Sequence, residues 1–358
     1  MDIMGRLGRV FSGLKDIDAI MLINTETKDS NFTYLTGFIG GTFEYTPLIA
    51  TRKGVVVLAS SLEYGIAKSQ AQRGMRVKRI DTYRHMMAEL SKGLKGKRVG
   101  FNGSFLPYRL HKLLAKNSKR AYDVSRAFRY ARAVKGRDEI RRIEVANDIA
   151  KAAMSSARKS LKEGITERRL AALIDYNMVI RGADSPSFDT IVSFGKNSAL
   201  PHHAPDGTRL KRNDIVLIDM GARYENYCSD ITRTFMFMPD PTSNKYKRFM
   251  GMYKTVMRAK RESIALTTIG RSGADAHNCA EKVINESDNG IYKGLFIHGL
   301  GHPVGLEVHD KGPGLAPMEG KLEENMVVSN EPGIYVEGFG GVRLEDDILI
   351  TRKGPMII

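Results

Sequence analysis

The sequence has 358 residues, of which 42% are hydrophobic and 27% are charged, and its formal net charge is +16. At about 150 residues per domain, this length predicts two domains, each with a buried core. The balance of apolar and charged residues excludes a disordered or collagen-like chain. Only two cysteines occur, Cys228 and Cys279, which excludes a small disulfide scaffold and leads us to expect a cytoplasmic location.

The apolar stretches of the sequence are short. The longest, such as those at 19–23 and 55–59, have five residues each, whereas a membrane-spanning helix needs about 20. The first residues, MDIMGRLGRVFS, show neither the apolar segment nor the cleavage site of a secretory signal. We therefore expect no membrane association and no secretory signal at this start of the chain.

The positive charge is concentrated near the N-terminus. Residues 1–130 hold 23 Lys and Arg residues and 10 Asp and Glu residues, a net charge of +13. Such a region can attract nucleic acid or another acidic partner. However, no run of five basic residues occurs, and aromatic residues do not interleave with the charges as in RNA-binding signatures. We therefore interpret the charge as a solvated surface and do not expect a nucleic-acid partner.

Strand and helix patterns alternate in the first part of the chain. Runs of β-branched and aliphatic residues predict strands, and amphipathic runs predict short helices. Together they indicate an α/β domain over residues 1–126, followed by a linker at 127–137 (AFRYARAVKGR). The expected strands are 19–23, 47–51, 54–59 and 98–101, and the expected helices are 63–73, 85–94 and 107–116.

The second part, residues 138–358, mixes long helices with strands, so the chain as a whole is of the α+β class. Apolar residues three and four apart predict its longest helix at 138–162. Thr166 is expected to cap a second helix that ends near Ile180. Further helices are expected at 244–267 and 274–287, and strands at 191–194, 215–220 and 342–350.

Two aspartates lie in a predicted hairpin, VLIDMGARYENYCSDITRT. A turn centred between Tyr224 and Glu225 would place Asp219 directly opposite Asp230, where like charges repel. Two facing carboxylates at a partly buried site need a shared proton or a cation between them. We favour a cation; the alternative is an exposed hairpin with both carboxylates in solvent.

The histidines are unevenly distributed. His85, His111 and His277 lie in charged helical patterns and are interpreted as surface residues. In contrast, His298, His302 and His309 fall within twelve residues of the Gly-rich stretch HGLGHPVGLEVH. Its two glycines and proline argue against the helical H-E-x-x-H zinc motif and favour a loop that brings backbone and imidazoles close to a ligand. His202 and His203 form a separate pair.

Two glutamates lie near the end of the chain. Glu331 directly precedes Pro332 and Gly333, which break a strand, and Glu345 lies in the predicted strand with Arg343 on the same face. Either glutamate taken alone could be a solvated side chain. Carboxylates outnumber histidines in the whole set and no cysteine pair accompanies them, which favours a hard or borderline metal such as Mn²⁺ over a structural zinc site.

The ordered set Asp219, Asp230, His302, Glu331 and Glu345 resembles the five metal ligands of the pita-bread metallopeptidases. This family includes Xaa-Pro dipeptidase (prolidase), aminopeptidase P, methionine aminopeptidase and creatinase. The resemblance extends to the flanking segments IDMGARYENYCSDITRTF, HGLGHPVGLEVHD, NEPGIY and GGVRLEDD. It implies a C-terminal pita-bread catalytic domain and, from NFTYLTG at 31–37, a creatinase-type N-terminal domain.

The resemblance also implies residue roles. Asp219 would bind one metal through both oxygens, Asp230 and Glu345 would bridge two metals, His302 would complete one site, and Glu331 would bind metal and shuttle a proton. A hydroxide between the metals would attack the peptide carbonyl. The metals would be Mn²⁺ or Co²⁺, with Zn²⁺ as an alternative. Four residues would line the substrate site, namely His202, His298, His309 and Arg343, whereas His203 is not expected to act directly.

Within the family, the resemblance favours a proline-specific peptidase. Methionine aminopeptidases normally lack the N-terminal domain, and creatinase lacks the full ligand set. We expect an Xaa-Pro dipeptidase that forms a homodimer and acts on proline-containing dipeptides or short peptides, with aminopeptidase P as the alternative. A non-enzymatic binding module with a basic N-terminal domain is a third hypothesis, against which the complete ligand set argues.

Overall fold

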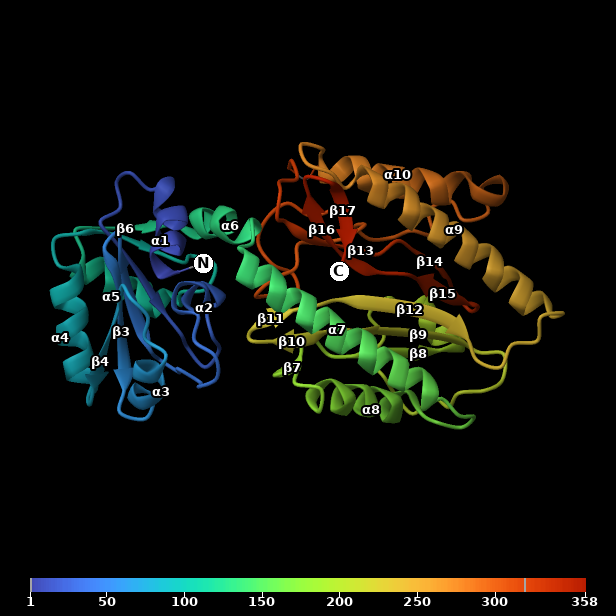
Figure 1. Ribbon diagram of the computed structural model, residues 1–358, viewed down its shortest axis with the longest axis horizontal. Helices are drawn as coiled ribbons and strands as arrows, with labels where there is room; N and C mark the ends of the chain where they lie inside the picture. The colour runs from blue at the N-terminus through green and yellow to red at the C-terminus, as the bar shows by residue number, and fades with distance from the viewer. Residues whose placement is uncertain (1, 319) are drawn as a thin grey trace. The chain divides into compact units, whose positions relative to one another are not determined.

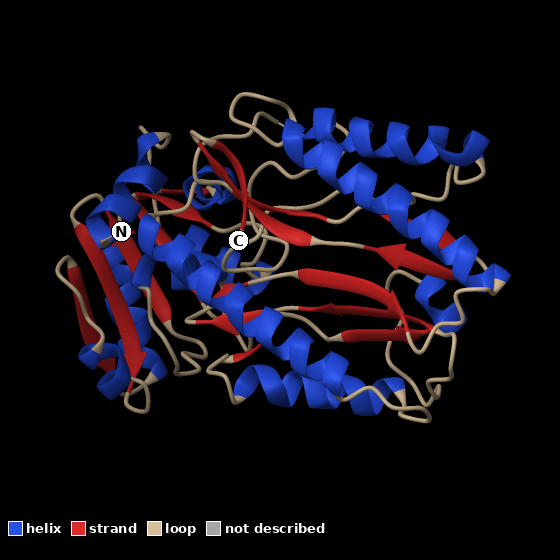
Figure 2. Ribbon diagram, turned by 45° about the vertical axis from the view of Figure 1, so that its right-hand side comes forward, coloured by secondary structure: helices blue, strands red, loops and turns tan. Residues whose placement is uncertain are grey.

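The computed structural model describes residues 2–318 and 320–358. The chain divides into two compact units, Met1–Arg132 and Ala133–Ile358, each of which mixes helices and strands (Figures 1 and 2). Among the described residues, no helix is both long enough and apolar enough to cross a bilayer. The segment 127–137, expected as a linker, is largely helical, since it contains the end of one helix and the start of the next.

The first unit is built on a mixed six-stranded sheet of order β4-β3-β2-β1-β5-β6. Alternate residues of the central strand, Ala19, Met21 and Ile23, pack with Leu90 and Leu114 of two helices in one apolar cluster. The strands are β1 Ala19–Ile23, β2 Pro47–Thr51, β3 Gly54–Ser60, β4 Met75–Ile80, β5 Arg98–Phe101 and β6 Arg120–Asp123; the helices are α1 Ile3–Ser12, α2 Ser30–Thr36, α3 Tyr64–Ser69, α4 Tyr83–Leu94, α5 Tyr108–Asn117 and α6 Ser125–Ala133.

All four strands predicted for this unit are present, and β4 and β6 are additional. These two are the edge strands of the sheet, and their sequences, MRVKRI and RAYD, carry charges at positions that water reaches. Because an edge strand needs little apolar surface, the hydrophobic pattern that identifies inner strands is missing here. Two short helices near the N-terminus, α1 and α2, were likewise not predicted.

The second unit has two halves, each consisting of a helix pair packed on β-sheet (Figures 1 and 2). One half packs α7 Arg137–Lys159 and α8 Glu167–Val179 on the sheet β12-β9-β8 around Ile174, Val192 and Ile218. The other half packs α9 Asn244–Leu266 and α10 Gly273–Glu286 on strands from the end of the chain around Val256, Ile284 and Ile348.

Four long helices were expected in this unit, and all four are present within three residues of the predicted ends, with Thr166 capping α8. Its strands are β7 Ser185–Pro186, β8 Ile191–Phe194, β9 Ile215–Met220, β10 Ala222–Tyr224, β11 Tyr227–Cys228, β12 Ile231–Met236, β13 Val327–Asn330, β14 Gly333–Val336, β15 Gly340–Arg343, β16 Asp346–Thr351 and β17 Gly354–Ile357; its 3-10 helices are η1 Gly195–Ala199 and η2 Ser287–Gly290.

The register predicted for the aspartate hairpin is wrong. Asp219 pairs with Thr232, and Tyr224 pairs with Tyr227, so the turn is centred one residue later than expected. Glu225 and Asn226 both have positive φ, 44° and 72°, as in the two-residue turns that match the twist of a hairpin. The residue opposite Asp219 is therefore Thr232 instead of Asp230, a shift of two residues along the second strand. Because side chains alternate between the two faces of a strand, a shift of two leaves Asp219 and Asp230 on the same face of the hairpin.

The strand predicted at 342–350 is interrupted. It forms β15 and β16, which belong to different sheets, and Leu344 and Glu345 lie between them. Glu345 donates its backbone N–H to the carbonyl of Thr232, at 3.1 Å. The break therefore joins the end of the chain to the aspartate hairpin.

Gly221 lies between β9 and β10, where the hairpin has no room for a side chain. A Cβ atom at this position would lie 1.9 Å from the Ser229 carbonyl oxygen and 2.2 Å from Ser187 Oγ. We predict that Gly221→Ala lowers the free energy of unfolding by about 1–3 kcal/mol through overpacking, measured by denaturant unfolding. Gly207→Ala is the matched control, because nothing lies within 4 Å of its Cβ. Equal midpoints for both variants would contradict this description of the hairpin.

Candidate metal centre

Two acidic side chains come from the hairpin. Asp219 is the fifth residue of β9, and Asp230 directly precedes β12. Both are buried, with 8% and 5% of their surface exposed. The structure therefore excludes the alternative of a solvated hairpin and places two carboxylates where an uncompensated charge is costly.

His302 lies in the Gly-rich loop, which is not helical, as predicted. Its Nε2 atom lies 3.5 Å from Asp230 Oδ2 and 3.5 Å from Glu331 Oε1. The loop is held against β13 by hydrogen bonds in both directions between His302 and Ser329. A Cβ on Gly301 would lie 2.0 Å from the Ser329 carbonyl oxygen, so glycine is required for this close approach.

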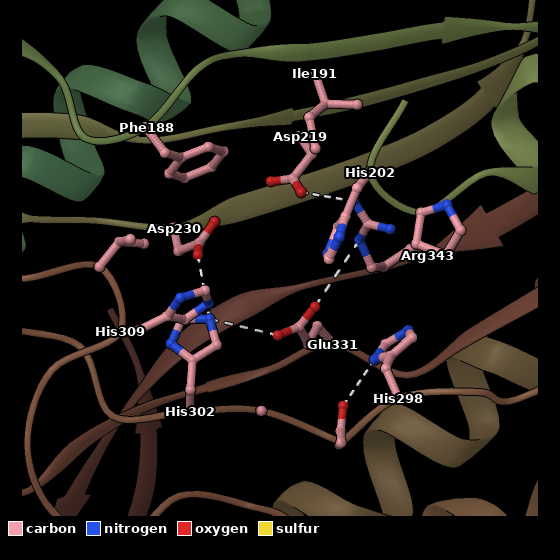
Figure 3. A pocket seen from close by; sticks show the side chains of 14 residues that line it. Phe188, Ile191, His202, Asp219, Asp230, His298, His302, His309, Glu331 and Arg343 are labelled. Carbon is pink, nitrogen blue, oxygen red and sulfur yellow. Dashed lines mark hydrogen bonds and ion pairs between the residues drawn. The ribbon is translucent and has the colours of Figure 1, made fainter. Parts of the chain in front are cut away.

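Glu331 and Glu345 approach from the C-terminal strands. Glu331 directly follows β13, and Glu345 occupies the break between β15 and β16. Ligand atoms of Asp230, His302 and Glu345 all lie within 4.8 Å of one another. The structure thus brings three of the five expected ligands together. It also places Glu331 beside His302 and turns Asp219 toward Arg343 (Figure 3).

Three buried carboxylate oxygens have no hydrogen-bond partner within residues 2–318 and 320–358, namely Asp219 Oδ1, Asp230 Oδ1 and Glu345 Oε1. The second oxygen of Asp219 accepts from Arg343 Nη2 at 2.6 Å, and that of Glu345 accepts from Thr232 Oγ at 2.6 Å. Buried polar atoms are nearly always satisfied. A set of free, converging carboxylate oxygens beside an imidazole is the donor set that divalent metal ions require.

Sequence reasoning missed three residues that hold this set in place. Tyr335 accepts a hydrogen bond from Arg343 Nη1 at 2.9 Å and lies 2.8 Å from His298 Nε2. Thr232 connects Glu345 with Arg343, whose Nε donates to Thr232 Oγ at 3.2 Å. Asp347 Oδ2 accepts from the backbone N–H of Asp230 at 3.1 Å. Of the three, only Thr232 could have been identified from the sequence, because the correct hairpin register places it opposite Asp219.

The electrostatics of the centre follow from its burial. Burial raises the pKa of Glu331 to about 8, and burial together with neighbouring carboxylates raises the pKa values of Asp230 and Glu345. Burial also lowers the pKa of His302 to about 3 and that of His298 to about 4. The short contacts of His302 with carboxylates are therefore not ion pairs, and its neutral imidazole is suited to bind a metal.

A cavity of about 390 Å³ opens beside these residues. His202, His298, His309 and Arg343 line it, as does an apolar wall of Phe188, Ile191 and Val308 (Figure 3). This size is near the lower end of the range for small-molecule sites, about 300–1,000 Å³. A ligand here would contact both polar groups and apolar side chains.

The interpretation of His277 as a surface residue is wrong. It is 6% exposed, its Nδ1 accepts a hydrogen bond from the backbone N–H of Leu300 at 3.2 Å, and its ring lies against Phe296. Its position on the inner face of α10 supports the loop that leads to His302. The sequence pattern of this helix does not reveal that His277 is buried, because apolar periodicity does not distinguish a buried imidazole from an exposed one.

Comparisons with known proteins agree with this geometry. The pattern of metallopeptidase family M24 matches residues 141–352, and that of the Creatinase/Prolidase N-terminal domain matches residues 11–134. The Xaa-Pro dipeptidase of Pyrococcus horikoshii is 36% identical over 348 residues, which cover 96% of this chain and 93% of the relative.

Solved structures match over nearly the whole chain. The Xaa-Pro dipeptidase of Bacillus anthracis has a TM-score of 0.88 at 30% identity and covers 99% of this chain and 97% of its own. The X-Pro aminopeptidase of Thermotoga maritima has a TM-score of 0.86 at 28% identity, with coverages of 97% and 96%. These matches confirm the predicted pita-bread fold with a creatinase-type N-terminal domain, and they show that the chain belongs to metallopeptidase family M24.

Proposed function

We propose that this chain is a dinuclear metal-dependent Xaa-Pro dipeptidase, a prolidase. The observation that carries the proposal is a set of three buried carboxylate oxygens, of Asp219, Asp230 and Glu345, that have no hydrogen-bond partner among the described residues. Asp230 and Glu345 offer ligand atoms within 4.8 Å of the His302 imidazole, and Asp219 and Asp230 line the small cavity. The similarity to Xaa-Pro dipeptidases along nearly the whole chain supports the substrate class.

The residues that would hold the two divalent ions are Asp219, Asp230, His302, Glu331 and Glu345. The free oxygens of the aspartates and of Glu345 support this assignment. Arg343 occupies Asp219 Oδ2, so binding through both oxygens of Asp219 requires Arg343 to share that atom. Four carboxylates and one imidazole favour Mn²⁺ or Co²⁺, and Zn²⁺ is the alternative.

When bound, two divalent ions supply Lewis acidity at the scissile carbonyl and a nucleophile at neutral pH. Glu331 lies between His302 and Arg343, where its carboxylate can accept the proton of the attacking water and pass it to the leaving nitrogen. His202 and His309 line the same cavity and can donate hydrogen bonds to the carbonyl oxygen as charge develops on it.

Proline at the cleaved bond fits the apolar wall. The prolyl nitrogen belongs to a tertiary amide without an N–H group, so a site for this bond needs no acceptor there. The pyrrolidine ring can pack against Phe188, Ile191 and Val308, three apolar side chains that line the cavity. His298, held by Tyr335, lies on the polar side.

Aminopeptidase activity on longer Xaa-Pro peptides is the second candidate function. The match to the X-Pro aminopeptidase of Thermotoga maritima favours it, because that structure fits nearly as well as the dipeptidase of Bacillus anthracis. We further propose a homodimer, supported by the family resemblance, and a cytoplasmic location, with which two cysteines that are both free are compatible.

The test of the function compares an Xaa-Pro dipeptide with an Xaa-Pro-Yaa tripeptide, each with Mn²⁺, with Co²⁺ and after chelation. We expect hydrolysis of the dipeptide alone and its loss with the chelator, measured as released proline. Cleavage of the tripeptide with little action on the dipeptide would move the assignment to the aminopeptidase. If neither peptide is cleaved by protein with bound metal, the peptidase proposal is wrong.

A second prediction concerns Asp230. Asp230→Asn keeps the shape of the side chain but removes the charge proposed to hold the ions. We expect kcat to fall by more than about 100-fold. Mutation of a residue that only hydrogen-bonds to a metal ligand already lowers metal affinity or activity by about 10- to 100-fold, and loss of a ligand should cost more. Asp175→Asn, which alters a partly buried aspartate bound to Thr190, is the matched control. Full turnover by Asp230→Asn with two metals bound would contradict the assignment.

A third prediction follows from the raised carboxyl pKa values. Below about pH 4 these groups are protonated in both folded and unfolded chains. As pH rises, the unfolded chain loses carboxyl protons that the metal-free folded protein keeps, so these carboxyl groups lower the folded stability, and Glu331 does so until about pH 8. The lowered pKa values of His302 and His298 act in the opposite direction, but only up to about pH 6.5, where the unfolded histidines lose their protons. Metal-free protein should therefore melt at a lower temperature at pH 8 than at pH 7.

Metal binding must displace these protons, so added Mn²⁺ should raise the melting temperature more at pH 8 than at pH 5. Calorimetry in buffers of different ionisation enthalpy measures the protons released. Metal binding without proton release would show that the bound ions do not contact these carboxylates.

A further inference from the structure

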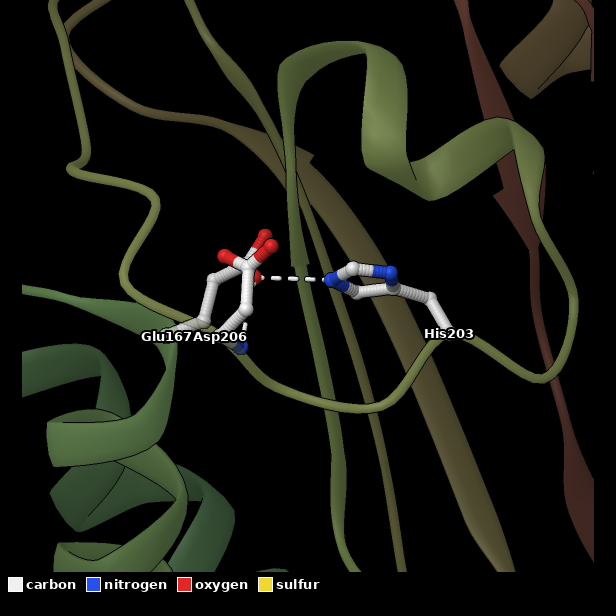
Figure 4. A group of neighbouring side chains, drawn as sticks. All are labelled: Glu167, His203 and Asp206. Atoms are coloured by element: carbon white, nitrogen blue, oxygen red, sulfur yellow. Dashed lines mark hydrogen bonds and ion pairs between the residues drawn. The ribbon is translucent and has the colours of Figure 1, made fainter.

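A second cluster of His and carboxylate groups lies outside the cavity lining. Glu167, His203 and Asp206 come within 4.8 Å of one another (Figure 4). Unlike the metal centre, this cluster has its key carboxylate saturated with donors. Glu167 Oε1 accepts from the Phe194 N–H at 2.7 Å and from Asn197 Nδ2 at 3.0 Å, and Oε2 accepts from His203 Nε2 at 2.8 Å and the Asp206 N–H at 3.1 Å. Four donors leave no oxygen of Glu167 for a cation, so we interpret the cluster as a hydrogen-bonded anchor.

The anchor fastens one loop to the first turn of α8. Glu167 is the first residue of that helix and is completely buried, where the helix N-terminus and four donors stabilise a negative carboxylate. The backbone adds two bonds, from Glu167 N–H to the Thr208 carbonyl and from Arg168 N–H to the Asp206 carbonyl, both at 3.1 Å. Because a carboxylate can only accept a hydrogen bond, the 2.8 Å contact with Glu167 Oε2 assigns the proton of the His203 ring to Nε2.

This loop carries His202. Leu200 to His203 form a turn with Pro201 at its second position, closed by a hydrogen bond from the His203 N–H to the Leu200 carbonyl at 3.1 Å. His202 lines the cavity, whereas the adjacent His203 bonds to Glu167. Among the described residues, the His202 ring makes no hydrogen bond that would fix it, and it is exposed. Its place therefore depends on the residues on either side of it.

We propose that Glu167 and His203 are positioning residues that hold His202 in the substrate cavity. This inference rests on the proposed function, because His202 is taken to act on the scissile group. In this proposal His203 does not contact the substrate and affects the reaction only by holding His202 in place. A group displaced by about 1 Å can lose on the order of 100-fold in rate, so a fixed loop is needed for an imidazole that has no bond of its own.

The test uses two variants of similar bulk. His203→Leu removes the donor to Glu167, whereas His203→Gln keeps a nitrogen donor at about the place of Nε2. We expect His203→Leu to lower kcat by about 10- to 100-fold with little change in KM or in metal content, and His203→Gln to restore most of the loss. If His203→Leu does not fold, His203→Asn takes its place, because its shorter amide falls short of Glu167.

A double-mutant cycle with His202→Ala separates positioning from general stability. If His203 acts through His202, His203→Leu should change kcat less than about twofold in the His202→Ala background. The control is Tyr227→Phe, which removes a buried hydrogen bond of 2.6 Å to Glu139, another carboxylate in a first helical turn. Its effect should be the same in both backgrounds. An undiminished effect of His203→Leu without His202 would overturn the proposal.

The position of His202 can also be measured without turnover. In protein loaded with diamagnetic Zn²⁺ and labelled at histidine, the His202 ring signal is assigned by its absence in His202→Ala. It should shift or broaden in His203→Leu and stay in place in His203→Gln; an unchanged signal in both variants would refute the positioning role. Because this signal does not depend on catalysis, failure of wild-type protein to cleave Xaa-Pro peptides would overturn the proposed function without deciding the role of His203.

Discussion

The structure of the second unit depends on one costly arrangement, in which carboxylates that have no hydrogen-bond partner for one oxygen are buried at the junction of two sheets. Removing an ion from water costs several kcal/mol even after the protein relaxes. Arg343 forms a buried ion pair with one oxygen of Asp219, whereas Thr232 only donates a hydrogen bond to one oxygen of Glu345. Each contact leaves the other oxygen of the carboxylate free. A bound cation would stabilise such an arrangement and would couple folding of this region to metal binding.

The two His–carboxylate clusters of this unit show how similar residue types serve opposite purposes. Both contain a buried carboxylate and an imidazole within 4.8 Å. Around Glu167 every oxygen is satisfied by donors from the chain, which produces rigidity. Around Glu345 one oxygen is left unpaired, which produces affinity for an ion. The number of free oxygens, rather than the distance between ligands, separates an anchor from a metal centre.

Sequence reasoning predicted the fold class, the long helices and the inner strands, because these depend on periodic apolar residues. It also selected Asp230, His302 and Glu345, which the structure brings within 4.8 Å of one another; their role as metal ligands stays a prediction. The hairpin register was missed by one turn position, which local propensities of Tyr224, Glu225 and Asn226 do not resolve, and Thr232 was missed with it. The supporting residues Tyr335 and His277 could not be predicted, because each contacts a partner distant in the chain.

Three consecutive acidic residues, Glu345, Asp346 and Asp347, differ in the charges that surround them. Asp346 contacts Arg233 Nη2 at 2.6 Å and also Lys260; burial alone would raise its pKa, but these two cations lower it. Among the described residues, its two neighbours have no such direct contact with a cation. Burial raises the pKa of Glu345 and raises that of Asp347 to about 7, although Arg343 near Glu345 and Lys151 near Asp347 act in the opposite direction. The chain thus places two cations directly on the middle carboxylate and leaves Glu345, which lies near Asp230 and His302, without such a contact. A metal ion would supply at Glu345 the positive charge that Lys260 and Arg233 supply at Asp346.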